Sequence, residues 1–129
     1  MKGVLWMERE DALALHDMVL AQHGGLAGVR DMGLLDSALN RPRLLHVYGK
    51  PDLPVLSAAY AHGIVQNHPF HDGNKRTGFL VAATFLESNG WSFTAAEAEV
   101  VISTVALADR KMSEAEYGAW LRRNSKELN

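Results

Sequence analysis

Apolar residues recur at three- and four-residue intervals in the first part of the chain, which is the spacing of one face of a helix. Between Glu8 and about Gln22 these positions are Ala12, Leu15, Val19 and Leu20. The pair Gly24-Gly25 follows, and glycine commonly ends a helix because it adopts left-handed backbone without strain. The pattern predicts a first helix over this segment.

A second amphipathic run extends from Met32 to Asn40. Its apolar positions are Leu34, Leu35, Ala38 and Leu39. We expect this helix to stop near Pro42, because the residue before a proline avoids helical backbone. The stretch 42–53, which contains a glycine and a second proline, is interpreted as a loop or flap.

Two further helical patterns flank residues 68–73. Pro54 suits the first turn of a helix, and residues 55–67 are small or apolar on nearly all sides, which is typical of a helix buried at the centre of a domain. After a break, a second pattern runs from Asn74 to Asn89 and ends at Gly90. The sequence therefore predicts a helix-loop-helix with this break as its loop.

The last third of the chain contains two capping-box patterns, Thr94-Ala95-Ala96-Glu97 and Ser113-Glu114-Ala115-Glu116. Each precedes an apolar-periodic run, so each predicts a helix start. No alternating strand pattern is long enough to predict a strand, and there is no repeat or linker. We predict a single all-α domain over residues 1–129, a compact bundle of about six helices.

Composition narrows the possible chemistry. The chain has no cysteine, which excludes thiolate nucleophiles, thiolate zinc sites and disulfides. Its net charge is −2, so nothing global favours nucleic acid or an anionic membrane. No apolar run approaches the roughly 20 residues of a membrane span. The first residues do not read as a signal peptide, and we expect a soluble cytoplasmic protein without direct nucleic-acid or membrane partners.

The loop residues indicate a phosphate site. Helix N-termini carry unpaired amides and partial positive charge, and Gly73 would let those amides come close to an anion. Lys75 and Arg76 add full positive charges where the helix dipole disfavours them by about 0.3–1 kcal/mol each. Cations at the unfavourable end of a helix indicate binding of a polyanionic phosphate.

Two neighbouring residues suit catalysis beside such a site. The Asp72 carboxylate could complete the shell of a magnesium ion that is held mainly by phosphates. His68 precedes it and could act as a general base, because the ordinary pKa of histidine is near neutral. A base, a metal ligand and a phosphate cradle thus fall within one short segment.

The segment His68-Pro69-Phe70-His71-Asp72-Gly73-Asn74-Lys75-Arg76 resembles the motif of the Fic/Doc family, His-x-Phe-x-Asp/Glu-Gly/Ala-Asn-Gly/Lys-Arg, at every fixed place. The run from Gly24 to Leu39 also resembles the amino-terminal part of Doc-type (death-on-curing) proteins. The resemblance implies the Fic/Doc fold. It covers most of the chain.

The resemblance also implies roles for individual residues. His68 would deprotonate the target hydroxyl, Asp72 would hold magnesium, and Asn74 and Arg76 would grip phosphates beside Gly73 and Lys75. Phe70 would anchor the loop in the core. The implied co-substrate is ATP with Mg²⁺.

Two positions bear on which group of ATP is transferred. Adenylyl-transferring Fic enzymes usually have glycine where this chain has Lys75, and a second arginine where it has Phe79. The Asn-Lys-Arg form resembles Doc, which implies transfer of the γ-phosphoryl group to a Ser/Thr hydroxyl of a translation protein, elongation factor Tu. Adenylyl transfer is the alternative.

The family resemblance also implies a partner. Many Fic proteins carry an inhibitory helix with Ser/Thr-x-x-x-Glu-Gly/Asn, and this sequence has no such string. A toxin-antitoxin pair is implied, in which a Phd-like antitoxin restrains the enzyme with a disordered tail that folds on binding.

Other interpretations remain open at this stage. The spacing His68-x-x-His71-Asp72 could be a transition-metal cluster or part of an HD-like metal phosphohydrolase, and the chain could be a non-catalytic binding module. The other histidines are expected to be structural: His16, His23, His46 and His62. Four basic residues could line a substrate or phosphate groove beside the loop, although such residues are usually solvated charges: Arg30, Arg41, Arg43 and Lys50. The tryptophans Trp6, Trp91 and Trp120 are expected to be core or interface anchors.

Overall fold

The computed structural model describes residues 3–128. This part of the chain forms six helices and two short strands, which confirms the all-α class. The helices are α1 (Arg9–His23), α2 (Met32–Gly49), α3 (Leu53–Asn67), α4 (Asn74–Ser88), α5 (Glu97–Ala108) and α6 (Glu114–Arg123). The strands are β1 (Trp91–Phe93) and β2 (Ser125–Glu127).

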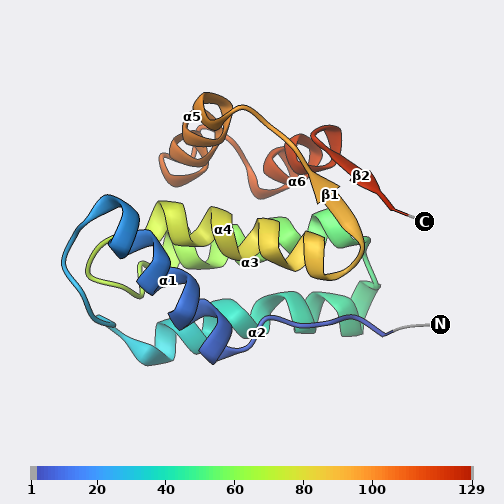
Figure 1. The fold of residues 1–129 in the computed structure, drawn as a ribbon. Coiled ribbons are helices and arrows are strands. Elements are labelled where there is room, and N and C mark those ends of the chain that lie inside the picture. The colour runs from blue at the N-terminus through green and yellow to red at the C-terminus, as the bar shows by residue number, and fades with distance from the viewer. Residues whose placement is uncertain (1–2, 129) are drawn as a thin grey trace.

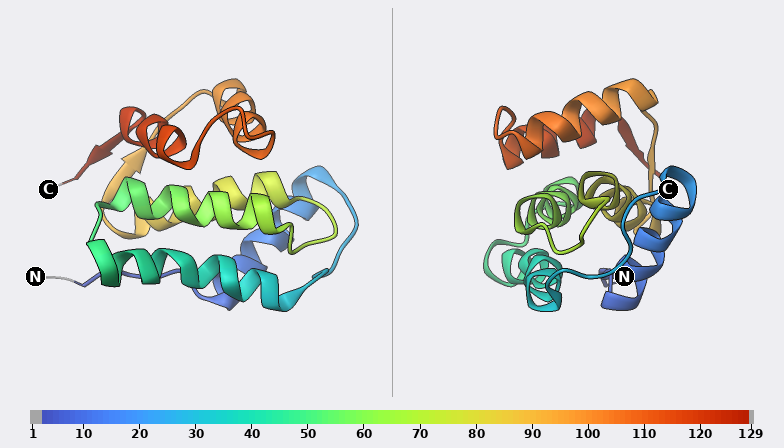
Figure 2. Two further views of the ribbon diagram at one scale, coloured as in Figure 1. Left: turned by 180° about the vertical axis from the view of Figure 1, so that it is seen from behind. Right: turned by 90° about the vertical axis from the view of Figure 1, so that its left-hand side faces the viewer.

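Helix α3 lies at the centre and contacts α2, α4 and α6. Helices α1 and α2 cover one side of the α3–α4 pair, and α5 and α6 cover the other (Figures 1 and 2). The prediction of a buried central helix is confirmed, since ten of its residues are buried. The loop between α3 and α4 lies at the end of the molecule opposite the α2–α3 connection and β2 (Figure 1).

The buried apolar residues form two clusters on the two sides of α3 and α4. The first core contains Met7, Ala12, Leu35, Ala38, Leu39, Leu56, Tyr60, Ile64, Phe70, Val81 and Phe85. The second core contains Ala58, Ala61, Ala82, Leu86, Leu107, Tyr117, Trp120 and Leu121. The first core reaches the α3–α4 loop through Phe70, so this side chain anchors the loop in the domain interior.

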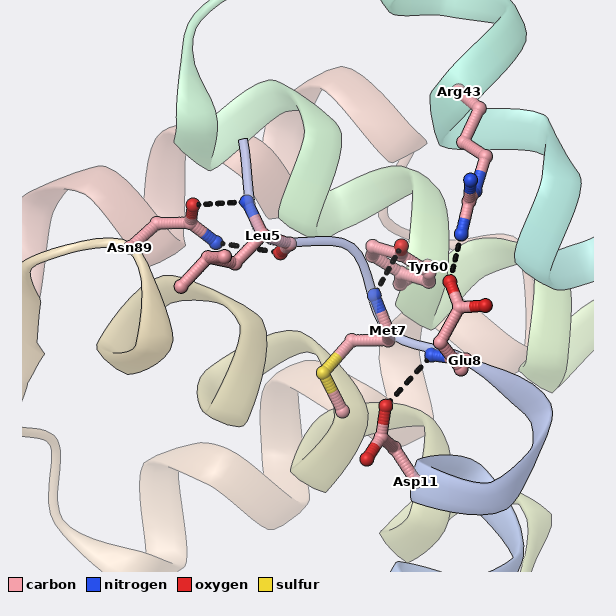
Figure 3. Close-up of polar contacts among 7 residues, drawn as sticks. All are labelled: Leu5, Met7, Glu8, Asp11, Arg43, Tyr60 and Asn89. Carbon is pink, nitrogen blue, oxygen red and sulfur yellow. Dashed lines mark hydrogen bonds and ion pairs between the residues drawn. The ribbon is translucent and has the colours of Figure 1, made fainter. Parts of the chain in front are cut away.

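The segment before α1 is held against the first core. Leu5 exchanges two backbone hydrogen bonds with the side chain of Asn89, and the Met7 amide donates to the Tyr60 hydroxyl at 3.0 Å (Figure 3). Burial raises the pKa of Tyr60 to about 12, so this hydroxyl stays protonated. The Glu8 amide donates to Asp11, which fixes the start of α1.

The prediction that the second helix stops near Pro42 is wrong. Helix α2 continues to Gly49, with Pro42 inside it and buried, so the expected flap 42–53 is mostly helix. Proline removes one backbone hydrogen bond there, but packing offsets this loss because α2 lies directly against α3. A Cβ added to Gly63 of α3 would come 3.0 Å from the Cβ of Ala38.

The two capping-box predictions have different outcomes. The box at Ser113 and Glu116 forms and starts α6, as predicted. The box at Thr94 does not form; α5 begins after Ala96, without a side-chain cap. The reason is that Thr94 continues the strand region, where its amide donates to the Asn124 carbonyl at 2.8 Å.

The small two-stranded sheet was not predicted from the sequence. Strands β1 and β2 pair antiparallel with Trp91 opposite Glu127 and Phe93 opposite Ser125. Each strand has only three residues, too few to show an alternating pattern. Among the described residues, none of the helices has the length and apolar character needed to cross a membrane.

Candidate functional site

The segment 68–78 joins α3 to the first turns of α4, and its residues fall into two groups. Pro69, Phe70, Asn74, Thr77 and Gly78 are buried. His68, His71, Asp72, Lys75 and Arg76 are exposed. The exposed group contains four of the residues to which the sequence assigned chemistry, so the local fold leaves these side chains accessible to solvent.

His68 occupies a strained position at the end of α3. Its backbone is left-handed, with φ of 54°, and its amide donates to the Ile64 carbonyl. A non-glycine residue in this conformation needs support from its surroundings. The Arg30 guanidinium supplies it, donating from Nε to the His68 carbonyl at 2.7 Å and from Nη2 to the Asn67 carbonyl at 3.0 Å.

Phe70 and Asn74 brace the loop from inside. The Phe70 ring is fully buried in the first core. The Asn74 side chain accepts from the Phe70 amide at 3.0 Å and donates to the Phe70 carbonyl at 2.9 Å. Its oxygen and one of its N–H groups are therefore engaged by the loop. Phosphate binding by this side chain stays a prediction.

His16 on α1 lies beneath the loop and is almost completely buried. Its ring stacks on Phe70 with 3.8 Å between ring centroids and 7° between planes. Its Nε2 lies 2.9 Å from the Asp72 carbonyl oxygen. The expectation that this histidine is structural therefore agrees with its burial, and the structure adds that it contacts the candidate site.

The segment 24–31, called the strap, lies across the other side of the loop. The Leu26 amide donates to Asp72 Oδ2 at 2.7 Å, and the amides of Arg30 and Asp31 both donate to the Pro69 carbonyl. Gly25 has φ of 123°, and an added Cβ would come 3.2 Å from the Asp72 Cβ. Glycine is required there by conformation and by space, which is why the strap can hold the Asp72 carboxylate so closely.

The amides at the start of α4 are available to a ligand. Gly73 precedes the helix with left-handed backbone, φ 80°. Within residues 3–128, the amides of Gly73, Asn74, Lys75 and Arg76 donate to no protein acceptor, whereas the next one, Thr77, donates to the Gly73 carbonyl. Four free donors beside two exposed cations are an arrangement suited to binding an anion, and this group is called the cradle.

A groove of about 880 Å³ opens beside the cradle, between α1, α4, β1 and α5. Lys75 and Arg76 lie along it, and most of the remaining lining is apolar. The lining includes Val19, Phe79, Leu80, Phe93, Val100, Val101 and Val105. The charged face of the loop therefore continues into an apolar surface.

Residues 6–86 match the model of the Fic/DOC family. The chain belongs to this family. The Toxin Doc of Mycolicibacterium smegmatis is 39% identical over 111 residues, a match that covers 81% of this chain and 82% of the relative. The Protein kinase doc of Escherichia phage P1 is 33% identical over 115 residues, covering 80% of this chain and 91% of the relative.

The remaining charged candidates lie outside this Fic/DOC site. Arg41 pairs with Glu114, and Arg43 pairs with Glu8. His62 lies 3.8 Å from Glu114. Burial lowers the pKa of His62 below its ordinary value, although Glu114 acts in the opposite sense. These residues therefore link helices to one another and do not line the anion cradle.

The structure does not support the alternative of a transition-metal site. Within residues 3–128, no three histidine, aspartate or glutamate side chains are grouped so that they could share a metal ion. His68, His71 and Asp72 are thus neighbours in sequence without forming such a group. His71 instead contacts the strap, where its amide donates to the Gly28 carbonyl at 3.3 Å.

Sequence reasoning did not connect His16 or the strap with the site, and it named Arg30 only as a possible groove residue, not as a support for His68. His16 lies 56 positions before Asp72, and no local pattern connects them. The strap did carry a signal. Its glycines at positions 24, 25 and 28 all have positive φ, and three glycines within five residues indicate a loop that packs closely on its neighbours.

Proposed function

We propose that this protein is a toxin that transfers the γ-phosphoryl group of ATP to a Ser/Thr hydroxyl of a protein. The observation that carries the proposal is the exposure of His68, Asp72, Lys75 and Arg76 within one short segment, beside the free amides of α4. Such a segment offers a base, a metal ligand and phosphate-binding groups close together. The relative named Toxin Doc supports the proposal of a toxin, and the relative named Protein kinase doc supports the proposal of phosphoryl transfer to a protein.

Magnesium fits the Asp72 carboxylate. Oδ2 is held by the Leu26 amide, which fixes the orientation of the carboxylate and leaves Oδ1 for a cation. Mg²⁺ is commonly held by one or two carboxylates together with substrate phosphates, so a single protein ligand is enough. The ion would neutralise charge on the phosphates when it is bound.

His68 would accept the proton of the target hydroxyl as its oxygen attacks the γ-phosphorus. The bond from that phosphorus to the bridging oxygen of ADP breaks, so the phosphoryl group passes to the target and ADP leaves. The amides of α4 and the side chains of Lys75 and Arg76 stabilise the negative charge that the phosphates carry. The proton on His68 is then released to solvent.

Phosphoryl transfer is favoured over adenylyl transfer by what surrounds the cradle. Lys75 adds an ammonium group at the cradle where adenylylating relatives of the family have glycine. Phe79 lies against Phe93 with 5.5 Å between ring centroids, so an apolar wall stands where a second arginine would have held a far phosphate. We propose elongation factor Tu as the target.

The reaction is tested with ATP labelled on either the α- or the γ-phosphate, in a bacterial translation extract and on purified elongation factor Tu. We expect label from γ only, and a mass gain of one phosphate on a threonine or serine. Label from α would identify an adenylyltransferase. If γ-labelled ATP labels a different protein, the proposed kinase activity stands and elongation factor Tu is replaced as the proposed target.

A Phd-like antitoxin is proposed as the partner of the groove. Val101 and Val105 of α5 are exposed apolar residues on its wall, and Lys75 and Arg76 lie at its charged side. This arrangement fits an amphipathic segment with acidic residues near the cradle, which would cover the phosphate site. The antitoxin tail would become ordered as it binds, and the ordered tail would inhibit the toxin by covering this site.

The partner is tested by co-expressing the toxin with its antitoxin. Val101→Glu should abolish rescue of growth while transfer activity persists, because a buried unpaired carboxylate is costly. Val47→Glu is the matched control, since Val47 is an exposed valine of α2 that does not line the groove. Full rescue of the Val101 variant would place the antitoxin on another surface.

A further inference from the structure

The hydrogen bond between His16 and the Asp72 carbonyl has a defined donor and acceptor, and this affects the backbone at the start of the cradle. A carbonyl oxygen can only accept, so Nε2 of His16 must carry the proton in this 2.9 Å hydrogen bond. His16 is almost completely buried, and its ring is fixed by its stacking on Phe70. The donor therefore comes from a rigid element, α1, that lies outside the loop.

This bond fixes the peptide between Asp72 and Gly73. In a planar trans peptide the C=O and the N–H point in opposite directions. Because the Asp72 carbonyl points toward His16, the Gly73 N–H points away from His16. The Gly73 amide is one of the four donors of the cradle.

Without such a bond this peptide would be easy to rotate. Gly73 adopts φ of 80°, and glycine tolerates positive and negative φ about equally, so rotation of the preceding peptide meets little steric resistance. A rotated peptide would turn a carbonyl oxygen toward the anion in place of an N–H. Space at Gly73 is limited on the same side by His16 and Val19, which lie 3.7 Å and 3.3 Å from the position of an added Cβ.

We propose that His16 is a positioning residue that holds the Asp72–Gly73 peptide with its N–H toward the nucleotide phosphates. The inference rests on the proposed function, because it assigns the ligand of this amide. In this role His16, which is buried, needs no contact with phosphate or target. It acts through one hydrogen bond on the backbone of the residue whose carboxylate is proposed to hold magnesium.

Two variants separate the hydrogen bond from the packing of the ring. His16→Phe keeps a ring on Phe70 and removes the donor, and His16→Gln keeps a donor at a similar reach and removes the ring. We expect the Phe variant to bind ADP about fivefold more weakly, which corresponds to about 1 kcal/mol for one lost hydrogen bond. The Gln variant should stay within about twofold of the wild type.

The peptide orientation is read in the ligand-free protein from the NMR signals of the Asp72 carbonyl carbon and the Gly73 amide nitrogen. Both should shift and broaden in the Phe variant and return toward wild-type positions in the Gln variant. Unchanged signals in the Phe variant would overturn the proposal. If wild type binds no ADP, the proposed function fails, and these signals still decide the role of His16.

One measurement needs no variant. In the wild type, the imidazole signals of His16 should show the proton on Nε2 at neutral pH, and a deprotonated Nε2 would refute the hydrogen bond. Leu121→Ala serves as the control for general destabilisation, because Leu121 lies in the second core, away from the loop. It should lower the melting temperature and leave ADP affinity unchanged. Equal loss of affinity in this control would show that stability alone explains the effect of His16.

Discussion

The buried and exposed residues of segment 68–78 differ in what they contribute. Pro69, Phe70 and Asn74 are packed or hydrogen-bonded inside the domain, whereas Asp72 and Arg76 face outward. The two groups alternate within one short segment, so the same few residues form part of the core and present the chemistry. This separation predicts that inward substitutions change the free energy of unfolding, and outward ones change catalysis or ligand binding.

The largest effect is expected at the proposed base. His68→Asn should lower the transfer rate about 10²–10⁴-fold, the usual contribution of a general base. Asparagine tolerates left-handed backbone, so the fold should keep its stability at this position of positive φ. Single-turnover transfer and urea unfolding are measured on the same preparation. A parallel loss of stability would remove the distinction between the two groups of residues.

Phe70→Ala should have the largest effect on stability. Removing a fully buried phenylalanine costs about 3–5 kcal/mol, and here the stacking on His16 is lost as well. Urea denaturation gives the free energy of unfolding. Phe70→Leu is the control, because it keeps much of the apolar volume and should cost markedly less. Equal costs for the two variants would show that the ring does not anchor the loop.

Asn74→Ala should cost about 1–3 kcal/mol, because it leaves the buried amide and carbonyl of Phe70 without their partner. The same unfolding experiment measures it. Asn74→Asp keeps the acceptor for the Phe70 amide and loses the donor, so an intermediate cost is expected. If the alanine variant instead retains full stability and only loses ATP affinity, the side chain binds phosphate and does not brace the loop.

Asp72→Asn should weaken the dependence of ATP binding on magnesium by about tenfold or more, since a neutral amide is a poorer ligand for Mg²⁺ than a carboxylate. The asparagine oxygen can still accept from the Leu26 amide, so the strap should stay in place. Calorimetric titration of ATP with and without Mg²⁺ checks this. An unchanged difference between the two titrations would exclude Asp72 as the metal ligand.

The smallest effect is expected at Arg30, which is exposed. Arg30→Ala removes two hydrogen bonds to carbonyls at the end of α3 and should cost about 0.5–1.5 kcal/mol. Because these bonds support the backbone of His68, the transfer rate should fall a few-fold with little change in ATP affinity. Arg30→Lys should restore part of the rate. A change confined to ATP affinity would instead indicate that Arg30 contacts the nucleotide.

Local patterns predicted the parts of this fold that depend on local chemistry. Helix spacing located α1, α3 and α4, glycine marked the end of α1, and the Ser113 box marked the start of α6. The motif located the exposed residues of the loop. These features follow from periodicity and capping within a few residues, which a single sequence displays directly.

The features that were missed depend on contacts between distant parts of the chain. Pro42 stays helical because α2 packs on α3. Thr94 does not cap α5, because its amide is hydrogen-bonded to the Asn124 carbonyl. His16 reaches the motif only after α1 has packed against α4. Propensity describes a segment alone, and here tertiary packing changed the outcome.

The pairing of β1 with β2 brings the two ends of segment 91–127 together. The segment between them, including α5 and α6, covers the side of α3 and α4 away from α2 and contributes to the second core (Figure 1). The family model ends at residue 86, just before this closure. Because both ends of the segment meet at this pairing, away from the motif loop, a change of length in the loops within it need not move the motif. If α5 binds the antitoxin as proposed, we expect pairing specificity among related toxins to vary in this segment more than in the motif loop.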